Sequence, residues 1–384
     1  MSRKILVSAG EASGDLYASL VIDELRRNAP DLDCFGCTGP RLRAEGVRTV
    51  VDAADLAVVG LVEVVGHLPR IWGEHRKLVA ATRRENPDLA ILTDSPDFHL
   101  PLARRLASQG VPVIYLVAPQ AWAWRKGRVK TLRRTVARLL CIFPFEEDFF
   151  RAAGVKATYI GHPLAGLVRS ELGREAFFRK HGFDPSRPLI AVLPGSRRGE
   201  AARHMPALMD AVCQLGQKEA LNFVLPASAT TGSSFFEGRV GDAPVRVIEG
   251  ESWDAMAHSA LALAASGTVT VEAALLGVPM VTFYRVTGAS WVLGKLLVKT
   301  PFYTMVNLVA ERQVVPELMQ RQMTGERIAA EALRLLRDAG ARERMQADLA
   351  DVRRRLSAAG PGEAPRRAAA IIQDILEGQV AHVS

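Results

Sequence analysis

Short apolar runs alternate with helix-like amphipathic stretches along most of the chain. In the N-terminal half, the apolar runs at 4–8, 89–93 and 113–117 each lead into a polar loop and then a helical pattern. Such runs are typical of strands buried on both faces of a parallel sheet, which needs helices as crossover connections. The same rhythm restarts at 189–193 and continues to 280–284. The pattern therefore predicts an α/β protein with two doubly wound units.

The length of the chain agrees with this division. Its 384 residues exceed what one hydrophobic core usually supports. A polar, charged stretch at 166–188 is typical of a linker into the second unit, and glycines and a proline at 360–362 interrupt the last helical region. We predict one unit over 1–165, a second over 166–355 and a helical tail over 356–384.

The loop after the first predicted strand is Ala9-Gly-Glu-Ala-Ser-Gly-Asp15. Its glycine spacing matches neither the dinucleotide fingerprint nor a P-loop. Glu11 and Asp15 would repel phosphate and suit sugar hydroxyls instead. The alternative is structural, with Ser13 or Asp15 capping the helix that we expect over 16–27.

Asp94 directly follows the apolar run at 89–93. Side chains just past the carboxyl end of a parallel strand face the crevice where ligands bind, so Asp94 lies where a general base is needed. Asp97 and His99 are alternatives, and either could instead cap the next helix, expected over 102–109.

After the run at 113–117, two tryptophans and an arginine, Trp122, Trp124 and Arg125, open a basic stretch that extends to 134. This composition predicts a basic, partly aromatic binding patch at the same sheet edge. A solvated basic helix is the alternative.

Two loops of the second unit suit phosphate. Pro194-Gly-Ser-Arg-Arg-Gly199 follows a strand, and its hydroxyl, amides and arginines can grip phosphate oxygens. Ala265-Ser-Gly-Thr268 opens a helix whose unpaired N–H groups favour anions, with Ser266 or Thr268 as the expected cap and Gly267 allowing close approach. Glu272, one turn later, suits ribose hydroxyls.

Composition narrows the function. Hydrophobic residues make up 48% and charged residues 23% of the chain, as in globular proteins, and the net charge is +8. With 6% aromatics and no zinc-finger spacing, a nucleic-acid partner is not expected, so the basic charge points to phosphorylated ligands or an anionic membrane surface.

Location and cysteine chemistry follow from the same reading. No secretory signal or membrane-spanning run is evident, so we expect a cytoplasmic or peripheral protein. Cys34 and Cys37 have no second pair to complete a zinc site and fit a strand end. The apolar segment 56–72, followed by basic residues, forms either a buried helix or a lipid-binding surface.

Taken together and in order, the motifs resemble those of lipid-A-disaccharide synthases, bacterial glycosyltransferases of the two-Rossmann-domain GT-B type (glycosyltransferase family 19). Eight stretches carry the likeness: Ala9–Asp15, Asp94–Phe98, Trp122–Arg125, Phe143–Glu146, Tyr159–His162, Leu193–Arg197, Ala265–Thr268 with Glu272, and Asn307–Leu308. Each motif alone is weak, whereas the ordered set is specific and covers nearly the whole chain.

The resemblance implies a fold and a reaction. Two Rossmann-like domains would face a central cleft, and the C-terminal helices would cross back to the N-terminal domain or to a partner subunit of a homodimer. UDP-2,3-diacylglucosamine would donate its sugar, with inversion and without metal or cofactor, to the 6-hydroxyl of 2,3-diacylglucosamine 1-phosphate. The products would be a β-1,6-linked disaccharide phosphate and UDP, formed at the cytoplasmic face of the inner membrane.

The resemblance also implies roles for individual residues. Asp94 would be the catalytic base, with Glu11 as its rival or as a residue that orients the acceptor. The first unit would bind the acceptor through Ser13, Gly14, Trp122, Trp124 and Arg125. The second would bind UDP through Gly195, Ser196, Arg197, Ser266, Gly267, Thr268, Glu272, Arg285 and Asn307.

Two other functions fit parts of the sequence. A UDP-N-acetylglucosamine epimerase or another UDP-sugar glycosyltransferase of the same fold would need no lipid surface. A binding protein without turnover would bind UDP and form no product. The acidic groups at Glu11, Asp94 and Asp97 favour an enzyme.

Overall fold

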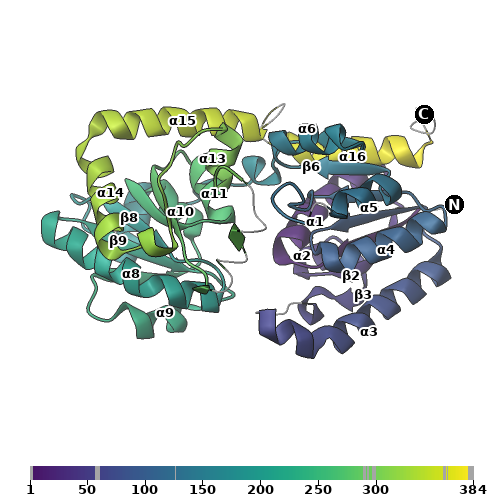
Figure 1. Ribbon diagram of the computed structural model, residues 1–384, viewed down its shortest axis with the longest axis horizontal. Coiled ribbons are helices and arrows are strands. Elements are labelled where there is room, and N and C mark those ends of the chain that lie inside the picture. The colour runs from purple at the N-terminus through teal and green to yellow at the C-terminus, as the bar shows by residue number, and fades with distance from the viewer. Residues whose placement is uncertain are drawn as a thin grey trace. The chain divides into compact units, whose positions relative to one another are not determined.

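The computed structural model describes residues 3–56, 61–125, 127–288, 291, 294–295, 300–357, 360 and 362–378, and the side chains of 61–68 lie outside this description. The chain divides into two compact units (Figure 1). Unit 1 comprises Met1–Gly166 together with Leu356–Ser384, and unit 2 comprises Leu167–Arg355.

Unit 1 is built on a parallel sheet that, within the described residues, has seven strands in the order β3-β2-β1-β4-β5-β6-β7. The chain moves outward from β1 to one side and resumes at β4 on the other, which creates a topological switch point between β1 and β4. The strands are β1 (Lys4–Ala9), β2 (Asp33–Thr38), β3 (Arg48–Asp52), β4 (Leu89–Thr93), β5 (Val113–Leu116), β6 (Arg138–Cys141) and β7 (Ala157–Tyr159).

Helices connect these strands and cover the sheet. They are α1 (Ala12–Asn28), α2 (Pro40–Ala44), α3 (Leu61–Glu85), α4 (Pro96–Ser108), α5 (Gly127–Thr135) and α6 (Pro144–Ala152), with short 3₁₀ turns at Ala53–Asp55 and Pro163–Gly166. The central strands β4 and β5 are buried along their whole length, which explains why their sequences are continuous apolar runs.

The C-terminal helix α16 (Glu363–Leu376) returns to unit 1 and packs against α1 (Figure 1). Arg366 lies 3.7 Å from Glu24 of α1, and the Arg367 guanidinium donates to the Tyr159 carbonyl at 3.1 Å. Ala368 and Ile372 are buried, so this helix completes the core of unit 1.

Unit 2 repeats the design. Its parallel sheet, in the part of the chain described, has the order β10-β9-β8-β11-β12-β13, with the switch point between β8 and β11. The strands are β8 (Leu189–Leu193), β9 (Asn222–Ala227), β10 (Val245–Glu249), β11 (Leu261–Ala265), β12 (Met280–Tyr284) and β13 (Glu317–Met319). The predicted fold class, two doubly wound sheets with a returning C-terminal helix, is confirmed.

The helices of unit 2 are α7 (Arg174–His181), α8 (Arg198–Lys218), α9 (Ser233–Val240), α10 (Ser252–Ala257), α11 (Thr268–Leu275), α13 (Met305–Ala310), α14 (Gly325–Arg337) and α15 (Ala339–Ser357), with a 3₁₀ turn at Gln320–Gln322. The stretch 166–188, predicted as a linker, contains α7. Phe177 and Phe178 on this helix are buried, so the segment belongs to the core of unit 2.

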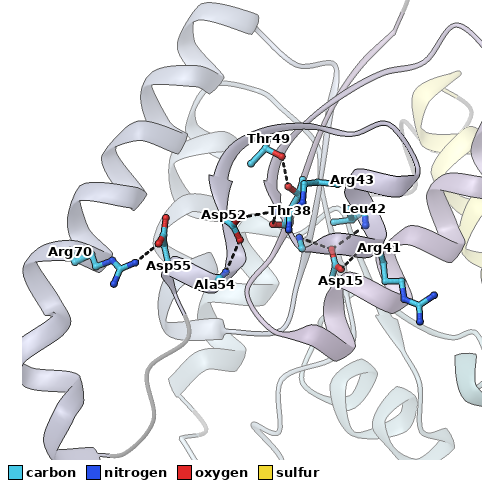
Figure 2. Close-up of polar contacts among 11 residues, drawn as sticks. Asp15, Thr38, Arg41, Leu42, Arg43, Thr49, Asp52, Ala54, Asp55 and Arg70 are labelled. Carbon is cyan, nitrogen blue, oxygen red and sulfur yellow. Dashed lines mark hydrogen bonds and ion pairs between the residues drawn. The ribbon is translucent and has the colours of Figure 1, made fainter. Parts of the chain in front are cut away.

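Asp15 has a structural role that differs from the predicted cap of α1. Its buried carboxylate accepts the backbone N–H groups of Gly39 at 2.7 Å, Arg41 at 2.8 Å and Leu42 at 3.2 Å, so it caps α2 (Figure 2). The expectation that Asp15 or Ser13 caps α1 is therefore wrong. The fourth residue of α1 faces the β2–α2 loop, and its charge satisfies the unpaired donors there.

Ion pairs extend the same network toward α3. Arg43 pairs with Asp52 at 2.9 Å, and Arg70 of α3 pairs with Asp55 (Figure 2). These contacts tie the carboxyl end of β3 and the turn after it to α2 and α3.

Most of the predicted apolar segment at 56–72 lies outside the described side chains. Trp72 is described and is 63% exposed, and the Arg76 guanidinium stacks 4.3 Å from its ring centroid. Among the described residues, no helix is both long enough and apolar enough to cross a bilayer.

Candidate active site

Asp94 closes the switch point of unit 1. Asp94 and Ser95 adopt φ angles of 53° and 35°, a left-handed turn that non-glycine residues seldom form. This turn brings the Asp94 carboxylate to the start of α1, where it accepts the N–H of Gly10 at 2.8 Å and of Glu11 at 3.1 Å. Glu11 is the N-cap residue of α1 and makes no side-chain cap of its own, so Asp94 supplies the cap from β4.

Two glycines make room for this carboxylate. A Cβ atom on Gly14 would lie 1.7 Å from Asp94 Oδ2, and one on Gly10 would lie 2.3 Å from Ser95 Oγ. Any side chain at either position would displace the carboxylate or the turn that presents it. Gly14, predicted to bind the acceptor, thus serves first to seat Asp94.

The side chains of Tyr115 and His99 hold the backbone of Asp94. Its carbonyl accepts the Tyr115 hydroxyl at 2.6 Å and lies 3.0 Å from His99 Nδ1, while His99 Nε2 lies 2.7 Å from Ser8 Oγ. Because α4 begins at Pro96 rather than near 102, His99 points into the core and is fully buried, and burial lowers its pKa to about 4. The alternative of His99 as the base is therefore wrong, and its role is to hold the turn.

The electrostatics of Asp94 suit proton transfer. Burial raises the pKa of the Asp94 carboxyl to about 7, the Gly10 and Glu11 amides oppose part of that rise, and the Glu11 carboxylate adds to it. Glu11 is exposed, and within the described chain its carboxylate has no hydrogen-bond partner. The structure thus places both predicted acids at the start of α1. Asp94 is half-buried, and Glu11 is exposed.

The aromatic patch divides into a packed and an open part. The Trp122 indole N–H donates to Glu146 Oε1 at 3.1 Å, and its ring packs edge-on against Phe145. Glu146 is buried, and burial raises the pKa of its carboxyl to about 8. Trp124 is only partly buried, and the exposed Arg125 stacks on it at 4.6 Å. Trp122 thus supports the loop, while Trp124 and Arg125 remain accessible; Ser13 is exposed near the start of α1.

In unit 2, the predicted phosphate loop lies at the switch point between β8 and β11. Ser196 and Arg197 are exposed at the start of the long helix α8, whose first N–H groups and positive dipole end favour an anion. Gly195 has a φ of 112°, and a Cβ there would lie 2.8 Å from the Glu200 carboxyl carbon. Glycine is therefore required at this turn.

The loop after β11 differs from the prediction in one respect. Gly267 is the N-cap residue of α11 and no side chain caps it, because the Ser266 hydroxyl donates instead to the Tyr303 carbonyl at 3.0 Å. The predicted cap by Ser266 or Thr268 is wrong. A Cβ on Gly267 would meet nothing within 4 Å, so the space beside this exposed backbone is open to a ligand. Thr268 is exposed beside it.

Glu272 lies in α11, about one turn after the Gly267 N-cap. Its carboxylate accepts the Trp253 indole N–H at 3.1 Å, and burial raises its pKa to about 7. One oxygen is thus oriented by Trp253, which leaves the other oxygen available to hydroxyl groups.

Arg285 and Asn307 are committed to the protein itself. The Arg285 guanidinium donates to the backbone carbonyls of Gln320 and Met323. Asn307 is fully buried, and its amide bonds both the backbone at Val314 and Val315 and the carboxylate of Glu317. The structure therefore gives both residues loop-shaping contacts, and their place in the UDP pocket stays a prediction.

Two residues that the sequence did not reveal organise unit 2. The buried His204 lies 2.8 Å from the Pro194 carbonyl through Nδ1, and its Nε2 accepts the Arg285 N–H at 3.0 Å. It thereby links the loops after β8 and β12. Glu317 accepts the N–H and hydroxyl of Thr304 and the N–H of Tyr303. The one sequence signal for the linking role of His204 is its position, one to two turns after the start of α8.

A pocket of about 720 Å³ lies at the carboxyl end of β13. Its described lining includes Trp291, Lys295, Tyr303, Gln320 and Arg321, so aromatic and cationic groups meet there. Among the described residues, no group of three or more His, Cys, Asp or Glu side chains is arranged to hold a metal ion.

Comparison with known proteins decides the family. The family model "Lipid-A-disaccharide synthetase" matches residues 5–372. A lipid-A-disaccharide synthase of Solibacter usitatus is 71% identical over 381 residues, covering 99% of this chain and 100% of the relative. The chain belongs to the lipid-A-disaccharide synthase family. A synthase of Koribacter versatilis is 42% identical over 371 residues, covering 96% of this chain and 97% of the relative, and the resemblance inferred from the ordered motifs is confirmed.

Solved structures show that the fold of this synthase family member is shared more widely. The UDP-GlcNAc 2-epimerase of Neisseria meningitidis, bound to UDP-GlcNAc, superposes with a TM-score of 0.68 at 14% identity, covering 97% of this chain and all of that one. The calicheamicin glycosyltransferase CalG4 gives a TM-score of 0.61 at 17% identity, covering 99% and 100% of the two chains. At these identities the likeness establishes the fold alone.

The seat of Asp94 can be tested with two glycine substitutions. Gly14→Ala places a methyl group 1.7 Å from Asp94 Oδ2, and we expect it to lower the free energy of unfolding by about 1–3 kcal/mol. Gly73→Ala in α3 meets nothing within 4 Å and should raise it by roughly 0.5–1 kcal/mol. Urea unfolding measures both, and equal effects of the two substitutions would contradict the described contact.

Proposed function

We propose that this member of the lipid-A-disaccharide synthase family carries out its reaction with a base from unit 1 and a leaving-group site in unit 2. The donor is UDP-2,3-diacylglucosamine, and the acceptor is the 6-hydroxyl of 2,3-diacylglucosamine 1-phosphate. The observation that carries this proposal is the half-buried Asp94 carboxyl at a switch point, whose pKa is raised to about 7. A carboxyl with this pKa is about half in its basic form at neutral pH and is basic enough there to accept a proton.

Asp94 acts as the general base. Each carboxylate oxygen accepts one backbone N–H, and the carboxylate keeps acceptor capacity for the hydroxyl of the sugar. As the acceptor oxygen bonds to the anomeric carbon, its proton passes to Asp94 and the carbon–oxygen bond to UDP breaks with its electron pair on UDP. One displacement of this kind inverts the anomeric configuration. Glu11, exposed beside it, orients the acceptor.

Unit 2 stabilises the negative charge that develops on the departing diphosphate. Arg197, Ser196 and the N–H groups after Gly195 supply donors at the start of α8. The Ser266-Gly267-Thr268 loop adds the start of α11, and Glu272 binds the ribose hydroxyls. Arg285 and Asn307 shape the neighbouring segments 320–323 and 314–317 through the contacts described above.

The acceptor binds to unit 1, which corresponds to the domain that the sequence predicts over 1–165. The donor binds to unit 2, which corresponds to the domain predicted over 166–355. Ser13, Gly14, Trp124 and Arg125 lie around the acceptor, and Trp122 holds their loop. Trp72, exposed and stacked with Arg76, supports docking to the cytoplasmic face of the inner membrane, where acylated substrates reside. A homodimer remains part of the proposal.

The reaction is tested by following UDP and sugar products together. We expect UDP release only when both the acylated donor and the acylated sugar phosphate are present, with formation of the disaccharide phosphate by mass spectrometry. Arg197→Ala should lower kcat/KM by about 10- to 150-fold, which is the loss of one charge-assisted interaction of ~1.5–3 kcal/mol. Conversion of the UDP-sugar without acceptor would indicate an epimerase, and UDP binding without product a binding protein.

The base assignment is tested by two amide substitutions. Asp94→Asn should lower kcat by about 10²- to 10⁴-fold because a positioned base is lost, while Glu11→Gln should have a smaller effect. In the wild type, kcat/KM should rise with pH through about 7, because Asp94 must lose its proton to act. Circular dichroism controls for folding. An Asp94→Asn enzyme near wild-type rate beside an inactive Glu11→Gln enzyme would transfer the role to Glu11.

A further inference from the structure

An ion-pair cluster lies next to the Asp94 turn. The carboxylate of Asp97, in the first turn of α4, accepts from Arg125 at 2.8 and 2.9 Å and from Arg128 at 2.8 Å. Both guanidiniums also stack on Trp124, at 4.6 and 5.1 Å from its ring centroid. One anion therefore holds two cations beside one indole ring, and the cluster keeps a net positive charge.

Stability alone does not account for this arrangement. Asp97 has a side chain that is 73% exposed and Arg125 one that is 49% exposed, and ion pairs of such exposure contribute about 0–1 kcal/mol. The loop that carries them is also strained, because Val117 and Arg125 have φ angles of 66° and 54°. Left-handed backbone at such residues costs about 1–3 kcal/mol each and is concentrated at functional sites.

The cluster still has binding capacity. Asp97 engages one terminal nitrogen of each arginine, Nη1 of Arg125 and Nη2 of Arg128. Across the described residues, no further hydrogen bond is made by the other guanidinium N–H groups of these two arginines. Two arginines fixed side by side, with N–H groups to spare, match the geometry of a phosphate monoester.

The cluster is also placed close to the reacting group. Asp97 follows Asp94 by three residues, and its helix begins at the turn that presents Asp94. Burial raises the pKa of the Tyr115 hydroxyl, which donates to the Asp94 carbonyl, and the positive charge of Arg128 opposes that rise. The Arg128 side chain is 10% exposed. A base and a phosphate site one short loop apart suit a sugar that carries both a reactive hydroxyl and a phosphate.

We infer that Arg125 and Arg128, stacked on Trp124 and oriented by Asp97, form the site that recognises the phosphate of the sugar acceptor. This inference rests on the proposed function and adds to it the group that selects a phosphorylated acceptor. The phosphate binds the free guanidinium N–H groups, and its attachment fixes the distal hydroxyl against Asp94. Discrimination between acceptors with and without phosphate therefore originates in these two side chains.

The test compares two acceptors in detergent micelles, 2,3-diacylglucosamine 1-phosphate and the same sugar without the phosphate. For each enzyme, the ratio of kcat/KM for the two acceptors is measured. Arg125→Gln and Arg128→Gln should each lower this ratio by about 10- to 100-fold, as expected for the loss of a charge-assisted phosphate contact. Arg125→Lys, which keeps the charge and loses the planar fork, should give an intermediate ratio.

Arg27→Gln is the matched control, because Arg27 is an exposed arginine in the last turn of α1, outside the predicted binding patch, and it too forms ion pairs with acidic side chains. It should leave the ratio at the wild-type value. Equal losses on both acceptors in the Arg125 and Arg128 variants, or unchanged ratios, would overturn the inference while leaving the reaction intact. Absence of disaccharide from either acceptor with the wild-type enzyme would instead contradict the proposed function.

Discussion

The Asp94 carboxylate, bonded to the amides of Gly10 and Glu11, is the contact on which unit 1 depends. It joins the end of β4 to the start of α1 across the switch point, and it supplies the helix cap that Glu11 does not. The same contact requires glycine at positions 10 and 14, a left-handed turn at 94 and 95, and the support of Tyr115 and His99.

This contact also carries a cost in stability. Burial raises the pKa of Asp94 above that of an exposed carboxyl, and the two amides offset only part of the rise. Since the folded state holds the proton more tightly than the unfolded state, the contribution of Asp94 to stability is largest below the unfolded pKa and is lost as pH rises toward about 7. The protein thus retains an arrangement that favours proton uptake over maximal stability, as is common at catalytic positions.

The sequence predicted the parts of this account that depend on local pattern. Buried parallel strands produce apolar runs, so the strand positions, the two doubly wound units and the loops at 9–15, 94–98, 194–199 and 265–268 could be predicted. Contacts between distant segments could not. Nothing in the local sequence shows that Asp15 caps α2, that Asp94 caps α1, or that Ser266 bonds to Tyr303. Asn307 matched a family motif and Arg285 was predicted to line the same pocket, yet both side chains bond to the protein itself, a distinction that only packing reveals.

The central claim is that the fold holds Asp94 as a base poised near neutral pH, and the most direct test is its own titration. Carbon-13 NMR of the Asp94 side-chain carboxyl, assigned by comparison with Asp94→Asn, reports its protonation in the folded enzyme. A midpoint near 7 is the predicted result. A midpoint near 4, the value of an exposed aspartate, would show that the amides outweigh burial and would contradict the account.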